Sequence, residues 1–182
     1  LMTEQALEWY RSIHGLHFAA LRYFNACGGL PGRGEAHQPE SHLIPRVLQI
    51  ALGQAESATI FGTDYPTPDG TCIRDYIHVS DLASAHTAAA RYLIDGGASD
   101  AINLGTGQGI SVRDVLDAAA RATGRPVPHA IAPRRAGDPA ELVANAAKAR
   151  RVLNWQPGNS AIDQVLQSAW AWHRKDSALK TS

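Results

Sequence analysis

The chain has 182 residues, and its 17 basic and 17 acidic side chains give a formal net charge of zero. A chain of this length forms one domain or slightly more and can bury about 70 % of its unfolded surface. Balanced charge excludes a broad basic field, so we expect no nucleic-acid partner, and we expect no membrane span because no apolar stretch is long enough. Two cysteines are too few for a disulfide framework, which favours a reducing, cytoplasmic setting.

Helical and strand signals alternate along the chain, which indicates an α/β fold. The predicted helices begin near Met2, Pro45, Ser80, Ser111 and Ser160. The predicted strands cover residues 17–22, 59–61, 72–79 and 101–104. Gly15 can end the first helix, and a glycine- and proline-rich loop fills most of the span between the first strand and Pro45.

Polar residues at helix starts predict where several helices begin. Ser80 can cap the helix that follows it. Ser111 with Asp114, and Ser160 with Asp163, have the spacing of a capping box. These signals are local, so they predict helix starts without any knowledge of the rest of the fold.

The segment 64–82, DYPTPDGTCIRDYIHVSDL, is the most informative stretch for function. Its two prolines exclude helix, and Asp69-Gly70 favours a tight reversal. The apolar residues that follow predict a strand, so we expect a hairpin that places Arg74 on a rigid element. A fixed guanidinium can bind phosphate oxygens two at a time. The residues alone fit equally an exposed surface hairpin with an Arg-Asp pair.

Three glycines, Gly105, Gly107 and Gly109, follow a predicted strand and precede a helix. A dinucleotide-binding turn needs a further glycine at position 110, which is Ile110, and an acidic residue at the end of a second strand. We therefore interpret the segment as a tight strand-to-helix turn. His78 and His86 have no partners at metal-ligand spacing, so we expect two core histidines and no metal site.

Five short segments of the sequence, taken in order, resemble segments of the UDP-glucose 4-epimerases of the extended short-chain dehydrogenase/reductase family. They are RYFNACG (22–28), IFGTDYPTPDG (60–70), RDYIHVSDLA (74–83), INLGTGQG (102–109) and PRRAGD (133–138). The resemblance runs from Leu1 to about His173. It implies that the chain begins just after the catalytic Tyr-x-x-x-Lys, so that it holds none of the catalytic residues.

That resemblance implies a fold and a domain division. We expect the C-terminal substrate-binding domain of an extended short-chain dehydrogenase/reductase, together with the last strands and helices of its Rossmann sheet, the N-terminal Rossmann half being missing. Residues 1–28 would end the Rossmann domain and 29–174 would form the mixed substrate-binding domain. Within the latter, 80–105 would return to the Rossmann sheet. Residues 175–182 would be a loose tail.

The resemblance also implies a binding site for UDP-glucose or UDP-galactose. Arg74 and Arg135 would bind the diphosphate and Asp138 would face the ribose, whereas Arg134 would face solvent. The other implied substrate-binding residues are Asn25, His42, Leu43, Thr59, Ile60, Phe61 and Leu142. Tyr23 and Phe24 would lie at the nicotinamide end of NAD. From the residues alone, Asn25 fits an Asx-type turn equally well.

The implied reaction interconverts UDP-galactose and UDP-glucose through a 4-keto sugar, with NAD accepting and returning hydride. The chain would anchor UDP and be inactive alone. A homodimer through the helix ending near Gly15 is implied, and Trp9 and Tyr10 fit that interface or core packing. Three alternatives stay open: a related UDP-sugar epimerase or decarboxylase, a non-catalytic UDP-sugar module or half of a split enzyme, and a fragment without independent function.

Overall fold

The computed structural model describes residues 1–37 and 39–180, without the side chains of residues 176–180. Its helices are α1 (Met2–His14), α2 (Leu43–Ala51), α3 (Val79–Ile94), α4 (Val112–Thr123), α5 (Ala147–Leu153) and α6 (Ile162–Lys180). Its strands are β1 (Ala19–Tyr23), β2 (Asn25–Cys27), β3 (Ala58–Phe61), β4 (Ile73–Arg74), β5 (Tyr76–His78), β6 (Asp100–Leu104), β7 (Ile110–Ser111), β8 (His129–Ala132) and β9 (Glu141–Leu142). The predicted α/β class is confirmed.

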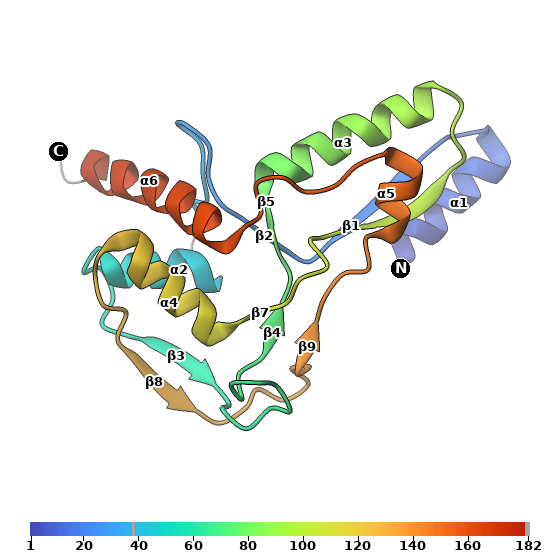
Figure 1. Ribbon diagram of the computed structural model, residues 1–182. Helices are drawn as coiled ribbons and strands as arrows, with labels where there is room; N and C mark the ends of the chain where they lie inside the picture. Colours follow the sequence, from blue (N-terminus) through green and yellow to red (C-terminus); the bar gives the residue numbers. More distant parts are fainter. Residues whose placement is uncertain (38, 181–182) are drawn as a thin grey trace.

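The strands form four small sheets rather than one large one. Three are parallel pairs, β1 with β6, β2 with β5, and β3 with β8. The fourth has the order β7-β4-β9, in which β4 is antiparallel to β7 and parallel to β9. Figure 1 shows α1, β1, α3 and α5 on one side of the molecule, and α2, α4, α6, β3 and β8 on the other.

Two hydrophobic clusters correspond to these two sides. One cluster contains buried residues of α2, β3, α4 and α6, and the other contains residues of α3, β6 and α5. The short strand β5 joins them: Tyr76 belongs to the first cluster and Ile77 to the second. Successive side chains of a strand point to opposite faces, so one strand can contribute to both cores.

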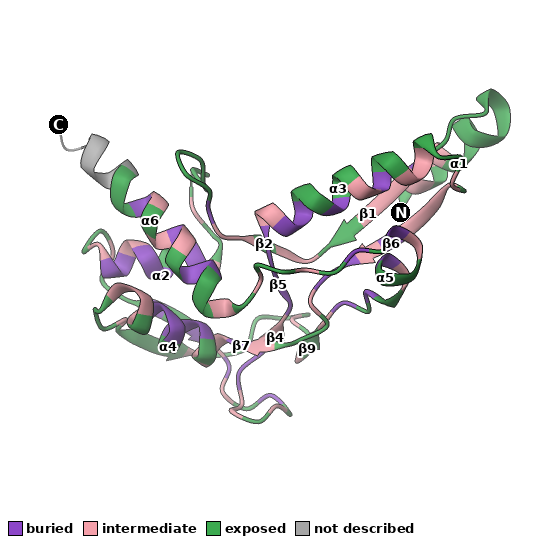
Figure 2. Cartoon of the chain, turned by 45° about the horizontal axis from the view of Figure 1, so that its top comes forward, coloured by how far each residue is buried: buried purple, intermediate pink, exposed green. Residues whose placement is uncertain are grey.

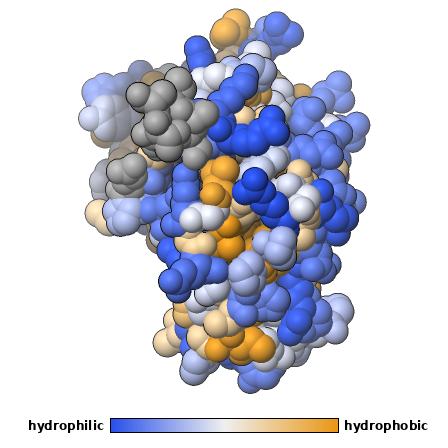
Figure 3. Space-filling model, turned by 90° about the vertical axis from the view of Figure 1, so that its left-hand side faces the viewer, coloured by the Kyte–Doolittle hydropathy of each residue, from blue (hydrophilic) through white to orange (hydrophobic). Residues whose placement is uncertain are grey.

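Burial differs sharply between the helices. The purple segments of Figure 2 mark the buried faces of α2 and α4, whereas α1 contains no buried residue. Trp9 and Tyr10 are 68 % and 58 % exposed, so the alternative prediction that they pack in the core of this chain is wrong for both. Figure 3 shows one face of the molecule on which groups of apolar residues are separated by hydrophilic ones.

The expected hairpin is wrong in its pairing, although its turn is confirmed. Gly70 has φ 79°, and a Cβ there would lie 2.1 Å from the Thr63 carbonyl oxygen, so only glycine fits. The two flanking strands do not pair with each other, because β3 pairs with β8 and β4 with β7 and β9. The expected strand 72–79 is also interrupted at Asp75, whose buried carboxylate binds backbone N–H groups of other segments.

Helix starts were predicted well where the cap is local. The Ser111–Asp114 capping box of α4 is present. For α3 the cap is His78, whose side chain accepts the Ser80 N–H, so Ser80 as the cap is wrong. The Ser160 box is also wrong: α6 begins at Ile162, and the Ser160 hydroxyl donates instead to the Asp81 carboxylate at 2.6 Å.

Two further expectations differ from the structure. Helix α6 continues to Lys180, so the expected loose tail is helical from residue 175 to 180, and residues 181–182 lie outside the described residues. His86 is exposed rather than in the core, although its ring does contact the Leu82 carbonyl oxygen at 2.7 Å. No described helix is long and apolar enough to cross a membrane.

Candidate functional site

One large pocket brings together most of the residues singled out in the sequence. Its volume is about 1010 Å³, and its walls come from the chain between β2 and α2, from β3 and β4, and from the loop after β8. The predicted residues that line it are Phe24, Asn25, His42, Leu43, Thr59, Phe61, Arg74, Arg135 and Asp138. A concave pocket with convergent polar groups is the usual form of a small-molecule site.

Arg74 is held in a fixed position on the pocket wall. Its side chain is only 13 % exposed, and one guanidinium nitrogen donates to the Ile73 carbonyl oxygen at 2.7 Å. A second nitrogen forms an ion pair with the Asp138 carboxylate. The residue beside it, Asp75, is 1 % exposed, so the alternative of an exposed Arg-Asp pair is wrong. The geometry is suited to presenting a charged donor at a defined place.

Arg135 approaches the same pocket from a different element. Its guanidinium carbon lies 3.8 Å from the centre of the Phe61 ring, a cation–π contact. Phe61 ends β3, and the parallel pairing of β3 with β8 brings the loop after β8 alongside it. The pocket therefore carries two guanidinium groups from separate segments, an arrangement that favours a ligand with more than one negative charge.

The N-terminus of α2 forms another part of the pocket. His42 is the N-cap residue, and no side chain caps the first turn. His42, Leu43 and Arg46 all line the pocket. The unpaired N–H groups at a helix N-terminus carry partial positive charge and bind anions. This end of α2 adds to the positive character supplied by the arginines.

Arg134 does not line the pocket. Its guanidinium pairs with the Asp64 carboxylate at 2.7 Å and stacks over the Tyr65 ring at 4.2 Å. The side chain is 40 % exposed, which agrees with the expectation that it faces solvent.

Asn25 is fixed by a long-range contact. Its side-chain amide donates to the Asp75 carbonyl oxygen at 2.9 Å, so the local Asx-type turn is wrong. Phe24 lines the pocket, whereas Tyr23 does not and instead lies edge-on to His86 with 6.1 Å between ring centres.

Two predicted substrate residues do not line the pocket. Ile60 is 1 % exposed and its side chain belongs to the core, which leaves only its backbone for contact with a ligand. Leu142 is 41 % exposed and pairs with Arg74 in the register of β4 and β9. Its predicted role near a hexose stays a prediction.

Sequence reasoning missed four charged residues of the pocket, Arg33, Glu35, Glu40 and Arg46. They lie in the irregular segment before α2 and in its first turn, where periodicity gives no signal. The only local indication was the density of glycine and proline between Gly28 and Pro45, since loops of that composition often carry binding residues.

The pocket's thiols are not suited to nucleophilic chemistry. Burial raises the pKa of the Cys27 thiol to about 12, with Asp75 and Asp81 adding to the effect. Burial also raises the pKa of the Cys72 thiol, against the opposing charge of Arg74. Both cysteines are free, and both stay protonated near neutral pH. These two thiols therefore supply no thiolate to the pocket near neutral pH.

The glycine turn after β6 is occupied by the protein itself. The Asp75 carboxylate accepts the N–H groups of Thr106 at 3.0 Å and Gly107 at 3.1 Å. A Cβ at Gly105 would lie 2.4 Å from the Ala144 Cβ. The interpretation as a tight strand-to-helix turn is confirmed, because this turn binds a side-chain carboxylate where a dinucleotide turn would bind phosphate.

The chain is an α/β protein with a large pocket that carries arginine side chains from separate segments. Residues 1–105 match the profile of the NAD dependent epimerase/dehydratase family. The chain belongs to this family.

Several similar proteins carry the name UDP-glucose 4-epimerase. The UDP-glucose 4-epimerase of Halalkalibacterium halodurans is 51 % identical over 177 residues, which are 96 % of this chain and 53 % of that protein. The structure of UDP-glucose 4-epimerase from Brucella ovis in complex with NAD matches with a TM-score of 0.90 and 46 % identity, covering 94 % of this chain and 53 % of that one. The Bifidobacterium longum enzyme in complex with NAD⁺ and UDP matches with a TM-score of 0.89 and 39 % identity, covering 97 % and 53 %. The chain thus spans about half the length of these relatives.

Proposed function

We propose that this chain is the UDP-sugar-binding part of a UDP-glucose 4-epimerase, which interconverts UDP-glucose and UDP-galactose. The observation that carries the proposal is the pair of guanidinium groups on one pocket: Arg74, fixed by Asp138, and Arg135, stacked on Phe61. A diphosphate offers several negative oxygens to such a pair. Relatives 43–51 % identical carry the name of this enzyme, which supports the choice of UDP-sugars.

The role of the chain's own residues is to hold UDP while the sugar moves. Both guanidinium groups are anchored before a ligand arrives, so little order has to be imposed on binding. With the diphosphate held at one place, the 4-keto hexose can turn about that anchor and present its other face. Thr59 and Phe61, at the exposed side of β3, are the proposed uracil contacts.

NAD, where bound, supplies reversible transfer of the hydrogen at C4 of the sugar. The residues present in this chain fit only the nicotinamide end of NAD. Phe24 lines the pocket, and Tyr23 comes directly before Phe24 in the sequence. The one glycine-rich turn of this kind in the described chain is filled by Asp75. We therefore assign Tyr23 and Phe24 to the edge of the cofactor site and no residue of this chain to its pyrophosphate.

We infer that the chain does not turn over substrate alone. No tyrosine in the sequence is followed four residues later by a lysine, the spacing that the resemblance assigns to the catalytic pair. The three lysines are Lys148, Lys175 and Lys180. The proposed division makes 1–28 the end of the Rossmann domain and 29–174 a mixed substrate-binding domain, within which 80–105 returns to the Rossmann sheet. The parallel pairing of β1 with β6 supports that return.

We also infer a homodimer through α1, which has no buried residue and exposes several large apolar side chains. Trp9, Tyr10 and Ile13 are each more than half exposed. The cytoplasmic setting expected from the sequence stays a prediction.

Calorimetry with UDP and uridine tests the binding assignment. We expect UDP to bind at least tenfold more tightly than uridine, because uridine lacks the diphosphate that the two arginines hold. Equal binding of the two ligands, or none, would contradict the proposal. A panel of UDP-sugars then tests a related epimerase or decarboxylase as the alternative.

A second experiment separates an epimerase half from a non-catalytic binding module. The chain is mixed with the N-terminal half of a homologous UDP-glucose 4-epimerase, and conversion of UDP-galactose is followed. Activity of the mixture, with none from either half, supports the epimerase. UDP binding with no activity in any mixture supports the module.

A further inference from the structure

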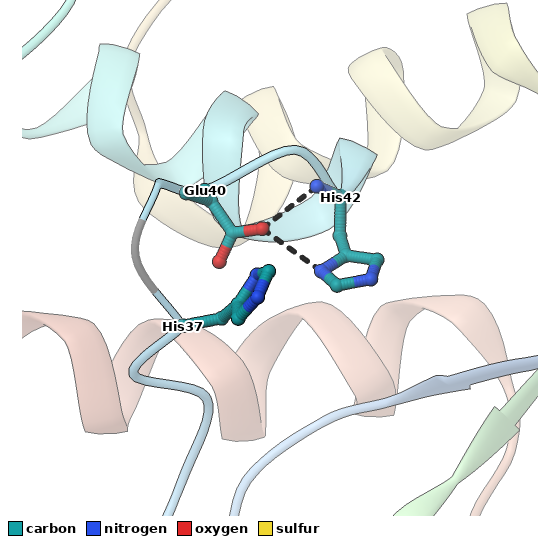
Figure 4. Close-up of side chains that lie close together, drawn as sticks. All are labelled: His37, Glu40 and His42. Carbon is teal, nitrogen blue, oxygen red and sulfur yellow. Dashed lines mark hydrogen bonds and ion pairs between the residues drawn. The ribbon is translucent and has the colours of Figure 1, made fainter.

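Three side chains with metal-binding atoms meet at the rim of the pocket. They are His37, Glu40 and His42, from the sequence HQPESH just before α2. One ligand atom from each residue lies within 4.8 Å of the other two. Figure 4 shows the polar ends of the three side chains directed toward a common space. Gln38 lies outside the described residues, and the three donors do not include it.

The segment that carries these donors is anchored at both ends. At its start, the Trp172 indole N–H donates to the Glu35 carbonyl oxygen at 2.8 Å, and the His37 N–H donates to the Glu35 carboxylate at 2.9 Å. At its end, His42 is the N-cap of α2, and its N–H donates to the Glu40 carboxylate at 2.7 Å. Donors on an anchored segment need little reorganisation to bind an ion.

The Glu40 carboxylate is largely buried. Its side chain is only 7 % exposed, and among the described residues it pairs with the His42 imidazole at 2.9 Å. Arg46 contacts the Glu40 backbone oxygen at 3.5 Å rather than the carboxylate. A buried carboxylate is stabilised by a cation within reach. A dication between Glu40 and the two imidazoles would supply that charge.

The donor set selects the kind of ion. Two imidazole nitrogens and one carboxylate oxygen are typical ligands of zinc and of related divalent transition metals. Calcium and magnesium prefer oxygen donors only, so they fit this set poorly. Three protein donors around a tetrahedral ion leave one position open. Glu40 and His42 also line the pocket, so the ion would lie at its rim.

We propose that His37, Glu40 and His42 form a binding site for a divalent transition-metal ion of the zinc class at the rim of the pocket. The proposal does not rest on the function assigned above. It differs from the sequence expectation of no metal, which considered His78 and His86. The sequence feature that corresponds to this site is the spacing His-x-x-Glu-x-His. It brings three donors together only when the chain turns into α2 as it does here.

Calorimetric titration of the full chain with Zn²⁺ tests the site. We expect one saturable site per chain, weakened at least tenfold by His37→Ala and by His42→Ala. His17→Ala is the matched control, because it removes one exposed imidazole elsewhere and is expected to leave the affinity unchanged. A double variant, His37→Ala with His42→Ala, that binds Zn²⁺ as tightly as the unaltered chain would overturn the proposal. So would an equal loss in His17→Ala.

Cobalt provides an independent readout that does not depend on affinity alone. Co²⁺ bound by three protein donors in a tetrahedral site gives strong visible absorption bands, whereas hydrated Co²⁺ does not. We expect these bands with the unaltered chain and with His17→Ala, and their loss in Glu40→Gln, which keeps the side-chain shape and removes the charge. Far-ultraviolet circular dichroism checks that each variant is folded. Absence of the bands in the folded, unaltered chain would also overturn the proposal.

Discussion

The Asp75 carboxylate accepts the Gly107 N–H at 3.1 Å and thereby fastens the turn after β6 to the point where β4 and β5 separate. The same carboxylate accepts the Ala144 N–H at 3.2 Å and the Thr106 hydroxyl at 2.7 Å. One buried side chain therefore joins three segments, of which one, β4, carries Arg74. The position of Arg74 and the position of the glycine turn therefore both depend on Asp75.

Replacement of Asp75 tests this arrangement. Asp75→Ala leaves the N–H groups of Thr106, Gly107 and Ala144 and the Thr106 hydroxyl without this acceptor, and we expect a loss of roughly 3 kcal/mol in the free energy of unfolding. Urea unfolding followed by circular dichroism measures it. The matched control is Asp163→Ala, whose ion pair with Arg121 is more than half exposed and is worth about 0–1 kcal/mol. Equal losses in the two variants would show that Asp75 does not hold these segments together.

Replacement of Arg74 tests the anion site. In Arg74→Ala a charge-assisted contact to the ligand is lost and Asp138 keeps an unpaired negative charge beside the pocket. We expect UDP to bind roughly 30-fold more weakly, which corresponds to about 2 kcal/mol. Calorimetry measures the affinity, with Arg121→Ala as the control because that arginine is exposed and does not line the pocket. An unchanged affinity in Arg74→Ala would remove Arg74 from the site.

The His78 imidazole predicts a pH dependence of stability. Burial lowers its pKa, against the opposing charge of Asp81, and its Nδ1 accepts the Ser80 N–H, which requires a neutral ring. The unfolded chain therefore takes up this proton first as the pH falls. The contribution of neutral His78 to the free energy of unfolding is fully present above the pKa of the imidazole in the unfolded chain, about 6.5, and it declines below that pH.

Unfolding at a series of pH values between 7.5 and 5.5 measures this effect. We expect the free energy of unfolding to fall with pH, and His78→Asn to flatten that dependence, because asparagine keeps a cap acceptor but does not titrate. His17→Ala is expected to keep the slope of the unaltered chain, since that imidazole is exposed. A slope that is the same in His78→Asn and in the unaltered chain would contradict the assignment.

Local signals explain why some elements could be predicted from the sequence. Gly15 ends α1 in the left-handed conformation, and Ser111 with Asp114 caps α4, because each signal acts within a few residues. The break at Asp75 and the partner of Ser160 could not be predicted in this way. Their contacts join residues 31 to 79 positions apart in the sequence.

In the candidate site, too, some residues could be predicted from the sequence and others could not. Arg74 and Arg135 were expected in one pocket because each lies in a segment that resembles the UDP-glucose 4-epimerases, and both line the pocket. The spacing of His37 and Glu40 was not enough to predict that they are partners, because their meeting depends on the irregular chain between β2 and α2. Periodicity has no information about such a segment, whereas turn residues predict only that it exists.

The exposed apolar side of α1 makes the last prediction, which concerns assembly. Trp9 and Ile13 are 68 % and 73 % exposed on neighbouring turns, so removing them from water by association is favourable. We expect the chain to show concentration-dependent association in sedimentation velocity, and the double variant Trp9→Glu with Ile13→Glu to shift it to the monomer. The matched control is Ile94→Glu, since Ile94 is 84 % exposed at the end of α3. Association that survives the double variant, or that Ile94→Glu abolishes equally, would place the interface elsewhere.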